Sequence, residues 1–162
     1  MTYKNTVGGS GGSPRYAHEN AIITILKMRE PRLTYELPSY ISGHDINYDH
    51  LTKDAIKHNL APELRFVLVN TLNLLQNHNV NYEKLEELKN SIVCLGESVD
   101  KRKPHIMINL DLPNLENILK DLQTKEEKES GVIGRLTYEG FKHTYLMNDG
   151  KGIHQQGSCR LS

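Results

Sequence analysis

The strongest constraint on the fold is a helix-start pattern that occurs three times. The stretches are 46–51, 80–85 and 113–118, and each has asparagine at its second position and an acidic residue at its fourth. Asparagine at a helix N-cap accepts hydrogen bonds from first-turn N–H groups, and an early acidic residue faces the positive end of the helix dipole. In the first two stretches, apolar residues at both ends suit a hydrophobic staple. Three helices are therefore predicted to begin close to these asparagines.

The spacing of this pattern favours a repeat but does not require one. Asn47, Asn81 and Asn114 are separated by 34 and 33 residues. A period in the low thirties is the length of one two-helix unit in a helical repeat array. In the second unit, however, a basic run and a proline interrupt the expected second helix, and apolar residues alternate like a strand at 106–110. Because asparagine caps are common, an irregular helical bundle stands beside the short two-helix repeat array as an alternative.

Apolar residues recur at helical spacing along most of the chain, so the predicted fold is mainly α. Pro38 and Gly43 lie in the stretch 33–43, which is expected to be an irregular connector. Beyond Gly131, apolar residues among glycines predict a short hairpin or an extended segment, a possible small β element in the C-terminal third. The segment 150–162 is expected to be a flexible tail. The predicted helices are 16–30, 48–59, 62–76, 82–99 and 114–129.

Composition limits the class of protein. A chain of 162 residues fits one domain, and 20 Lys and Arg balance 20 Asp and Glu. Balanced charge supplies no overall attraction to nucleic acid or to an anionic membrane. No apolar stretch reaches the roughly 18 residues of a membrane span. With Cys94 expected to act as a small apolar residue and Cys159 in a polar tail, an intracellular location, cytoplasmic or nuclear, is predicted.

The first thirteen residues differ from the rest. Residues 8–13 repeat Gly-Gly-Ser twice, which we interpret as an engineered flexible linker. On this interpretation, 1–7 (MTYKNTV) is a short fused peptide or a native segment joined across a deleted loop, and 14–149 is a helical interaction domain. A natural glycine-rich loop is the alternative. Six linker residues span roughly 13 Å on average and about 20 Å when stretched, so the peptide is expected to dock near the first helix.

The favoured function is a protein–protein interaction module that binds a short peptide segment of a partner. In the stretch 62–76, Phe66 and Val69 widen the apolar face beyond the usual stripe. Such a helix either is central in the bundle or lines a groove. An extended peptide can also pair with a strand edge at 106–110 or 132–138. The candidate partner-binding residues are Tyr3, Val7, Phe66, Val69, Asn73, Ile108 and Tyr138.

Nucleic-acid binding is the alternative function. A basic cluster of three residues would contact phosphates, and a later segment interleaves basic residues with aromatic rings that can stack on bases. The near-neutral overall charge argues against this function. The residues are Lys101, Arg102, Lys103, Tyr138, Phe141 and Lys142.

Motifs for catalysis and metal binding do not match. The acidic stretch that begins at Asp45 resembles the opening of a calcium loop, but His50 and Ile56 stand where glycine and glutamate are required. The eight histidines lack the spacing of a zinc site. No nucleophile elbow, phosphate loop or dinucleotide fingerprint is present. We therefore expect no enzyme, cofactor or metal; a small hydrolase with a His/Asp site, from His44, Asp45 or His143, is a less favoured alternative.

Overall fold

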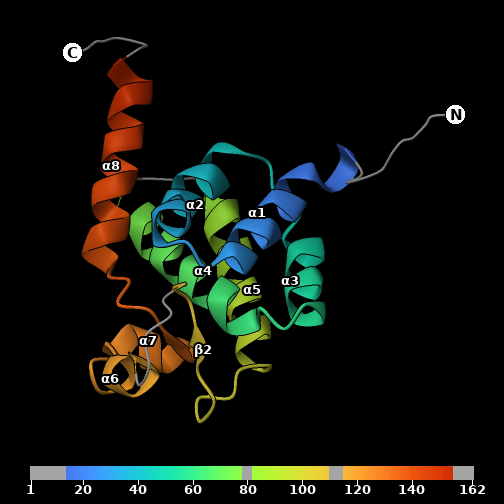
Figure 1. Ribbon diagram of the computed structural model, residues 1–162. Helices are drawn as coiled ribbons and strands as arrows, with labels where there is room; N and C mark the ends of the chain where they lie inside the picture. Colours follow the sequence, from blue (N-terminus) through green and yellow to red (C-terminus); the bar gives the residue numbers. More distant parts are fainter. Residues whose placement is uncertain (1–13, 78–81, 110–114, 155–162) are drawn as a thin grey trace, which may run out of the picture.

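The computed structural model describes residues 14–77, 82–109 and 115–154, which fold mainly as helices (Figure 1). The helices are α1 (Ala17–Met28), α2 (Pro31–Gly43), α3 (Tyr48–Lys57), α4 (Ala61–Gln76), α5 (Tyr82–Gly96), α6 (Leu115–Asp121), α7 (Lys125–Ser130) and α8 (Tyr138–His154). A short 3-10 turn at Pro14–Tyr16 precedes α1. Two short strands, β2 (His105–Ile106) and β3 (Val132–Ile133), pair in parallel. The predicted mainly α fold with a small β element is confirmed.

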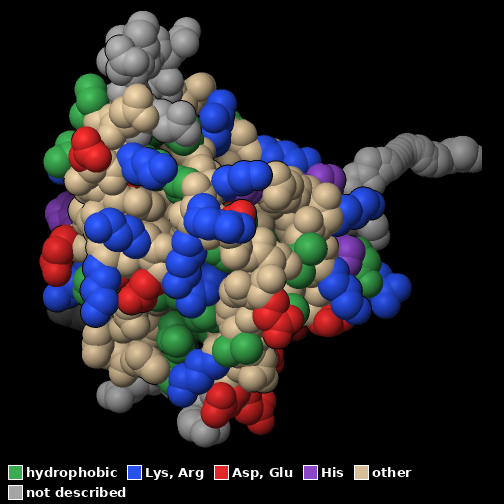
Figure 2. All heavy atoms as spheres, turned by 90° about the horizontal axis from the view of Figure 1, so that it is seen from below, with side chains coloured by type: hydrophobic (Ala, Val, Ile, Leu, Met, Phe, Trp, Pro, Cys, Tyr) green, Lys and Arg blue, Asp and Glu red, His purple; other side chains and the backbone are tan. Residues whose placement is uncertain are grey.

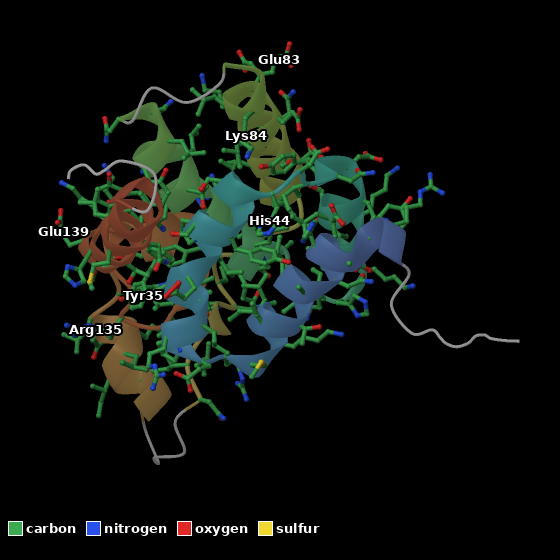
Figure 3. All side chains as sticks on the ribbon, turned by 90° about the horizontal axis from the view of Figure 1, so that it is seen from above. Tyr35, His44, Glu83, Lys84, Arg135 and Glu139 are labelled. Atoms are coloured by element: carbon green, nitrogen blue, oxygen red, sulfur yellow. The ribbon has the colours of Figure 1, made fainter. Side chains whose placement is uncertain are left out.

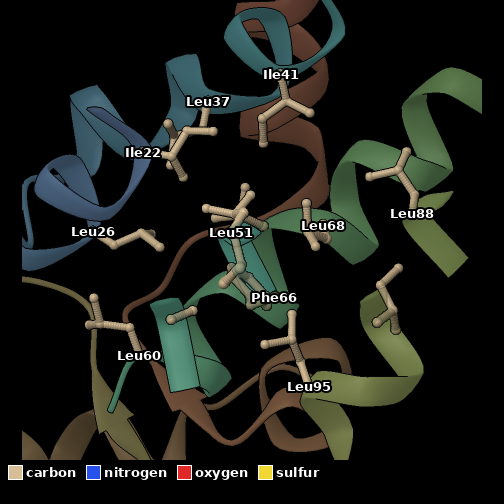
Figure 4. Close-up of a cluster of buried hydrophobic side chains, with 14 of the residues drawn as sticks. Ile22, Leu26, Leu37, Ile41, Leu51, Leu60, Phe66, Leu68, Leu88 and Leu95 are labelled. Carbon is tan, nitrogen blue, oxygen red and sulfur yellow. The ribbon is translucent and has the colours of Figure 1, made fainter. Parts of the chain in front are cut away.

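Helix α4 is the centre of the bundle and contacts α2, α3, α5, α7 and α8 (Figure 1). Its wide apolar surface is therefore explained by contacts on several sides, with Phe66, Val67 and Leu68 all buried (Figure 4). Helix α2 also packs on α8, which is distant in the sequence. In a repeat array each unit contacts only its neighbours. The arrangement is thus an irregular helical bundle.

The helix-start pattern is confirmed where the structure describes it. The side chain of Asn47 accepts a hydrogen bond from the His50 backbone N–H over 3.0 Å, and Ile46 and Leu51 are both buried. Helices α5 and α6 begin at Tyr82 and Leu115, directly after the other two asparagines. Those asparagines themselves, like the proposed peptide and linker at 1–13, lie outside the described residues.

The prediction of an irregular connector at 33–43 was wrong. Pro31 occupies the first turn of α2, where its missing N–H is not needed, and Glu30 caps the helix by accepting from the Arg32 N–H. Pro38 lies inside the helix, but Leu37 and Ile41 are fully buried. Burial of this apolar face outweighs the local cost of the proline.

The predictions for the last third were partly wrong. Beyond Gly131, β3 is the one strand of the described residues, and it pairs in parallel with β2. The segment from Tyr138 onward is helix α8, whose Phe141 is fully buried against α2 and α4. Helix α8 ends at His154, inside the range assigned to a flexible tail. The helix predicted at 114–129 is two helices, because Thr124 forms a capping box with Glu127 and starts α7 anew.

Two further findings concern the surface. Cys94, which was expected to act as a small apolar residue, is exposed because it faces away from the seam of Leu88, Ile92 and Leu95 on α5. Within the described ranges, every helix is too short or too polar to cross a bilayer.

Candidate functional site

A cavity of about 420 Å³ lies between α3 and α5. Fully buried leucines next to the cavity-lining residues, Leu51 and Leu88, anchor both helices in the hydrophobic core. The start of α3 contributes Ile46, Asn47, Tyr48, Asp49 and Thr52 to the lining. The facing side of α5 contributes Glu87, Asn90, Ser91 and Cys94. Ligand pockets commonly have volumes of about 300–1,000 Å³, so this cavity can hold one side chain or a small molecule.

Two buried hydroxyl groups of the cavity wall lack hydrogen-bond partners. Tyr48 and Thr52 are 7% and 5% exposed, and neither hydroxyl oxygen is bonded to another described residue. Leaving a buried hydroxyl unpaired costs about 1–3 kcal/mol. Burial raises the pKa of Tyr48, and the nearby carboxylates of Glu87 and Asp45 raise it further. The phenol therefore stays protonated at neutral pH and can both donate and accept a hydrogen bond.

A second hollow of about 370 Å³ shares Ile46, Tyr48 and Glu87 with the first. It extends to Ser42 at the end of α2. Lys84 of α5 lines this hollow and donates hydrogen bonds to the carbonyl oxygens of Ile41 and Ser42 over 3.2 and 2.8 Å. Figure 3 shows Lys84 on α5 near His44 at the end of α2. Partial burial lowers the pKa of Lys84, while Asp45 and Glu87 oppose this shift. Lys84 thus caps the negative end of the α2 dipole.

Carboxylates dominate the charge of this double hollow. Asp49 and Glu87 line the first part without any lysine or arginine, and Asp45 and Glu83 join Glu87 in the second. Asp49 forms an exposed ion pair with Lys53, which water screens strongly. Among the described lining residues Lys84 is the one cation, and its ammonium already bonds to carbonyl groups. The hollow therefore has an acidic character that favours a cationic group.

The N-terminal end of the described chain lies close to this cavity. The Tyr16 ring stacks on the His50 ring, with 3.6 Å between ring centroids. His50 belongs to the first turn of α3, whose residues Asn47 and Asp49 line the cavity. Tyr16, near the N-terminal end of the described chain, therefore contacts the first turn of α3.

Comparison of the chain with protein-family models, curated proteins and solved structures finds no match. No residue role is therefore carried over from a relative.

The residues predicted to bind a partner do not line the cavity. Phe66 is 1% exposed and packs edge-to-face on Phe141 in the core, so it cannot meet a partner at the surface. Ile108 is buried in a smaller cluster, and Tyr138 is half-buried with its hydroxyl accepting from Asn77 of the α4 end. Val69 and Asn73 are half-buried on α4, whereas Tyr3 and Val7 lie outside the described residues. The cavity was not predicted from sequence, because a helix start alone accounts for the residue types at 47–49.

Only some of the residues predicted to bind nucleic acid are exposed at the surface. Lys101, Arg102 and Lys103 are exposed, with Arg102 bonded to Asp100. Figure 2 shows many Lys and Arg side chains on the face seen from below. Phe141 is fully buried, so the prediction that it stacks on bases was wrong, and Lys142 and Tyr138 are half-buried.

The histidines considered for a hydrolase are separated. His44 bonds through its ring to the Tyr40 carbonyl oxygen and belongs to a ring cluster with His18 and Tyr40, while His143 is exposed on α8. The closest His–carboxylate pair of the described residues is His105–Glu63, at 2.8 Å. In the described ranges, no three His, Cys, Asp or Glu side chains are placed to hold a metal ion.

Proposed function

We propose that this chain is a protein-interaction module that binds a basic segment of a partner in the acidic cavity between α3 and α5. The observation that carries the proposal is that Tyr48 and Thr52, whose buried hydroxyls lack hydrogen-bond partners among the described residues, line a cavity together with Asp49 and Glu87. Buried polar groups are normally paired, and exceptions require an explanation. A bound ligand that pairs with them supplies one.

A lysine side chain of the partner fits this chemistry. Its ammonium group has three N–H donors and no acceptor, which suits two hydroxyl oxygens and the carboxylates of Asp49 and Glu87. Hydrogen bonds with a charged partner are roughly twice as strong as neutral ones. The aliphatic stem of lysine can contact Ile46 at the cavity edge.

The segment 1–7 has the composition of such a partner. Lys4 is its one charged side chain, and the glycine–serine linker at 8–13 connects it to Pro14 beside α3. A linker of this length reaches roughly 13 Å on average and about 20 Å when stretched. Tethering raises the effective concentration to about the millimolar range, which is useful only when the untethered interaction is weak. We therefore propose Lys4 as an occupant of the cavity, with Tyr3 and Val7 as its neighbours in the bound peptide.

The test uses a chain of residues 14–162 and the synthetic peptide MTYKNTV, followed by isothermal titration calorimetry and amide NMR. Binding of micromolar to millimolar affinity is expected, with the largest shifts at Ser91 and Glu87. Replacing peptide Lys4 by Gln should weaken binding about tenfold or more, because the charge-assisted hydrogen bonds are lost. Unfolding of the shortened chain, or no binding at millimolar peptide, would contradict the proposal.

Matched tyrosine variants separate this site from the surface predicted from sequence. Tyr48→Phe removes the unpaired hydroxyl without changing the ring, so it should leave the protein at least as stable while weakening the peptide. Tyr138→Phe is the control, since Tyr138 lies on α8 away from the cavity lining. Equal binding by Tyr48→Phe and a loss with Tyr138→Phe would move the site to α8.

Nucleic-acid binding is the second candidate, and the basic face in Figure 2 is the observation that favours it. Lys101 and Lys103 are exposed and available for contact. Binding of single-stranded oligonucleotides through phosphates should weaken steeply with salt, and Lys101→Ala with Lys103→Ala should reduce that slope. Salt-independent or undetectable binding would eliminate this candidate.

A further inference from the structure

Another cavity, which shares no residue with the two hollows described above, lies where the α1–α2 junction meets the segments that follow β2 and β3. Its volume is about 420 Å³. Pro31, Ile108 and Leu119 give it an apolar lining, and Arg29 and Arg135 lie at opposite junctions of its wall. The cavity therefore combines an apolar interior with two guanidinium groups.

Both arginines adopt a left-handed backbone conformation. The φ angles are 52° for Arg29 and 59° for Arg135, and Asn59, at 61°, is the one other non-glycine residue with positive φ in the described ranges. Glycine adopts this conformation most readily, and asparagine tolerates it better than arginine does. Two of three such residues thus meet at one cavity, and both carry a positive charge. Backbone strain of this kind concentrates at functional sites.

Buried hydrogen bonds hold Arg135 in this conformation. Glu127 is 1% exposed, and its Oε2 atom accepts hydrogen bonds from the backbone N–H groups of Gly134 and Arg135 over 2.7 and 2.9 Å. The Oε1 atom accepts from the Thr124 N–H and is fixed by the capping box. On the other side of the cavity, Glu30 caps α2 immediately after Arg29. The turns that carry the two arginines are therefore preorganised.

Among the described residues, no side chain pairs with either guanidinium group. Neither Arg29 nor Arg135 forms a side-chain hydrogen bond or an ion pair within the described part of the chain. Arg29 has only a longer-range electrostatic effect on Glu63. The Glu30 carboxylate, which also lines the cavity, is used by the α2 cap. Figure 3 shows Arg135 at the periphery of the molecule, where a ligand can reach it.

We propose that this cavity binds a carboxylate attached to an aliphatic chain. The guanidinium groups of Arg29 and Arg135 would pair with the carboxylate, because arginine matches its geometry with two parallel N–H donors. The aliphatic chain would contact Ile108 and Leu119. The ligand is either a free aliphatic acid or the C-terminus of a protein that ends in an aliphatic residue, and the two share this chemistry.

The experiment titrates the full chain with sodium octanoate and with the peptide acetyl-Ala-Ala-Leu bearing a free carboxylate. Calorimetry and the amide NMR signals of Asn109 and Arg135 report binding. Saturable binding is expected, and 1-octanol and the amidated peptide should bind about tenfold more weakly or worse because they lack the charge. Binding of octanoate identifies a free acid as sufficient, whereas binding of the peptide alone identifies a protein C-terminus. Binding of neither acid at millimolar concentration overturns the proposal.

Glycine substitutions separate a role of the arginines in ligand binding from a role in the stability of the fold. Arg29→Gly and Arg135→Gly each relieve the left-handed strain, so the midpoint of thermal unfolding should stay equal or rise while acid binding weakens about tenfold or more. Asn59→Gly relieves the same strain outside the cavity and should leave binding unchanged. Unchanged binding in both arginine variants, or an equal loss in Asn59→Gly, overturns the proposal. Because the α3–α5 cavity shares no residue with this one, failure here leaves the peptide proposal intact.

Discussion

The two halves of the described chain are ordered by different physical means. From α1 to α5, long helices bury apolar side chains at regular spacing in one continuous core (Figure 4). From β2 to β3, the elements are short. Met107 and Val132 reach the main core, whereas Ile108, Leu119 and Ile133 form a small separate cluster. There, buried polar groups provide much of the order: Glu127 binds three backbone N–H groups, and Gln123 donates to the Val132 carbonyl oxygen over 2.7 Å.

The two regions are therefore expected to unfold in different ways. A core built from many contacts distributes its stability, and removing one side chain affects the whole cooperative unit. A segment organised by one carboxylate concentrates its order in a few hydrogen bonds, and removing them opens a local region first. The two proposed sites lie in different regions. One cavity lies between the long helices α3 and α5, and the other borders the short elements that follow β2 and β3.

The largest effect is expected in the helical core. Leu88→Ala should lower the free energy of unfolding by about 2–5 kcal/mol, because Leu88 is fully buried between α5 and the rest of the bundle. Urea unfolding monitored by circular dichroism measures the change. Val93→Ala on the same helix is the control, since Val93 is 68% exposed and should change little. Similar losses in the two variants would contradict the assigned orientation of α5.

A smaller and more local effect is expected at Glu127. Glu127→Gln keeps the size of the side chain but removes the charge, and it should lower stability by about 1.5–3 kcal/mol. Amide hydrogen exchange should accelerate at Gly134 and Arg135 before it changes at Leu68 in α4. Glu126→Gln is the matched control, because Glu126 is exposed on the same helix. Uniform acceleration throughout the chain would show that the two regions unfold as one.

The helix cap of α3 gives the next test. Asn47→Ala removes the acceptor for the His50 N–H and should lower stability by about 0.5–2 kcal/mol in urea unfolding. The repeated sequence pattern predicts a loss of the same size for Asn81→Ala at the start of α5. A loss in one variant only would show that the shared pattern does not mean a shared cap.

The sequence predicted the first region well because burial there follows helical periodicity. The seam of Leu88, Ile92 and Leu95 and the cap at Asn47 were both readable from local spacing. The helix at Pro31–Gly43 was missed because local rules for proline favoured a connector, whereas tertiary burial decided the outcome. Likewise, glycines near Tyr138 concealed the helical spacing of α8.

Neither cavity could be predicted from sequence. The α3–α5 cavity joins residues about 40 positions apart, and its evidence is the absence of partners for two hydroxyls, which only the structure shows. Asp49 is part of the repeated helix-start pattern, and this role alone accounts for an acidic residue at that position. The arginine cavity depends on backbone angles at Arg29 and Arg135, and no residue type signals a left-handed arginine in advance.

The smallest effect concerns the junction of the two regions, where the carboxyl group of Glu63 in α4 is hydrogen-bonded to the Nδ1 atom of His105 in β2 over 2.8 Å. Burial raises the pKa of Glu63 above its ordinary value of 4.5, and interactions with His105 only partly oppose the shift. As the pH rises from below 4.5, the unfolded chain therefore releases this proton before the folded chain does. The free energy of unfolding should fall through the window between 4.5 and the raised pKa, because the folded state binds more protons there.

Glu63→Gln removes this titration, so its stability should fall less than that of the unchanged protein across the same window. The exposed Glu126→Gln variant retains Glu63 and should follow the unchanged protein. Urea unfolding at intervals from about pH 4 to about pH 8 supplies the curves. A constant difference between Glu63→Gln and the unchanged protein at every pH would mean that the carboxyl is well solvated. The contact between α4 and β2 would then be open to water, and the two regions would be less firmly joined than the buried pair implies.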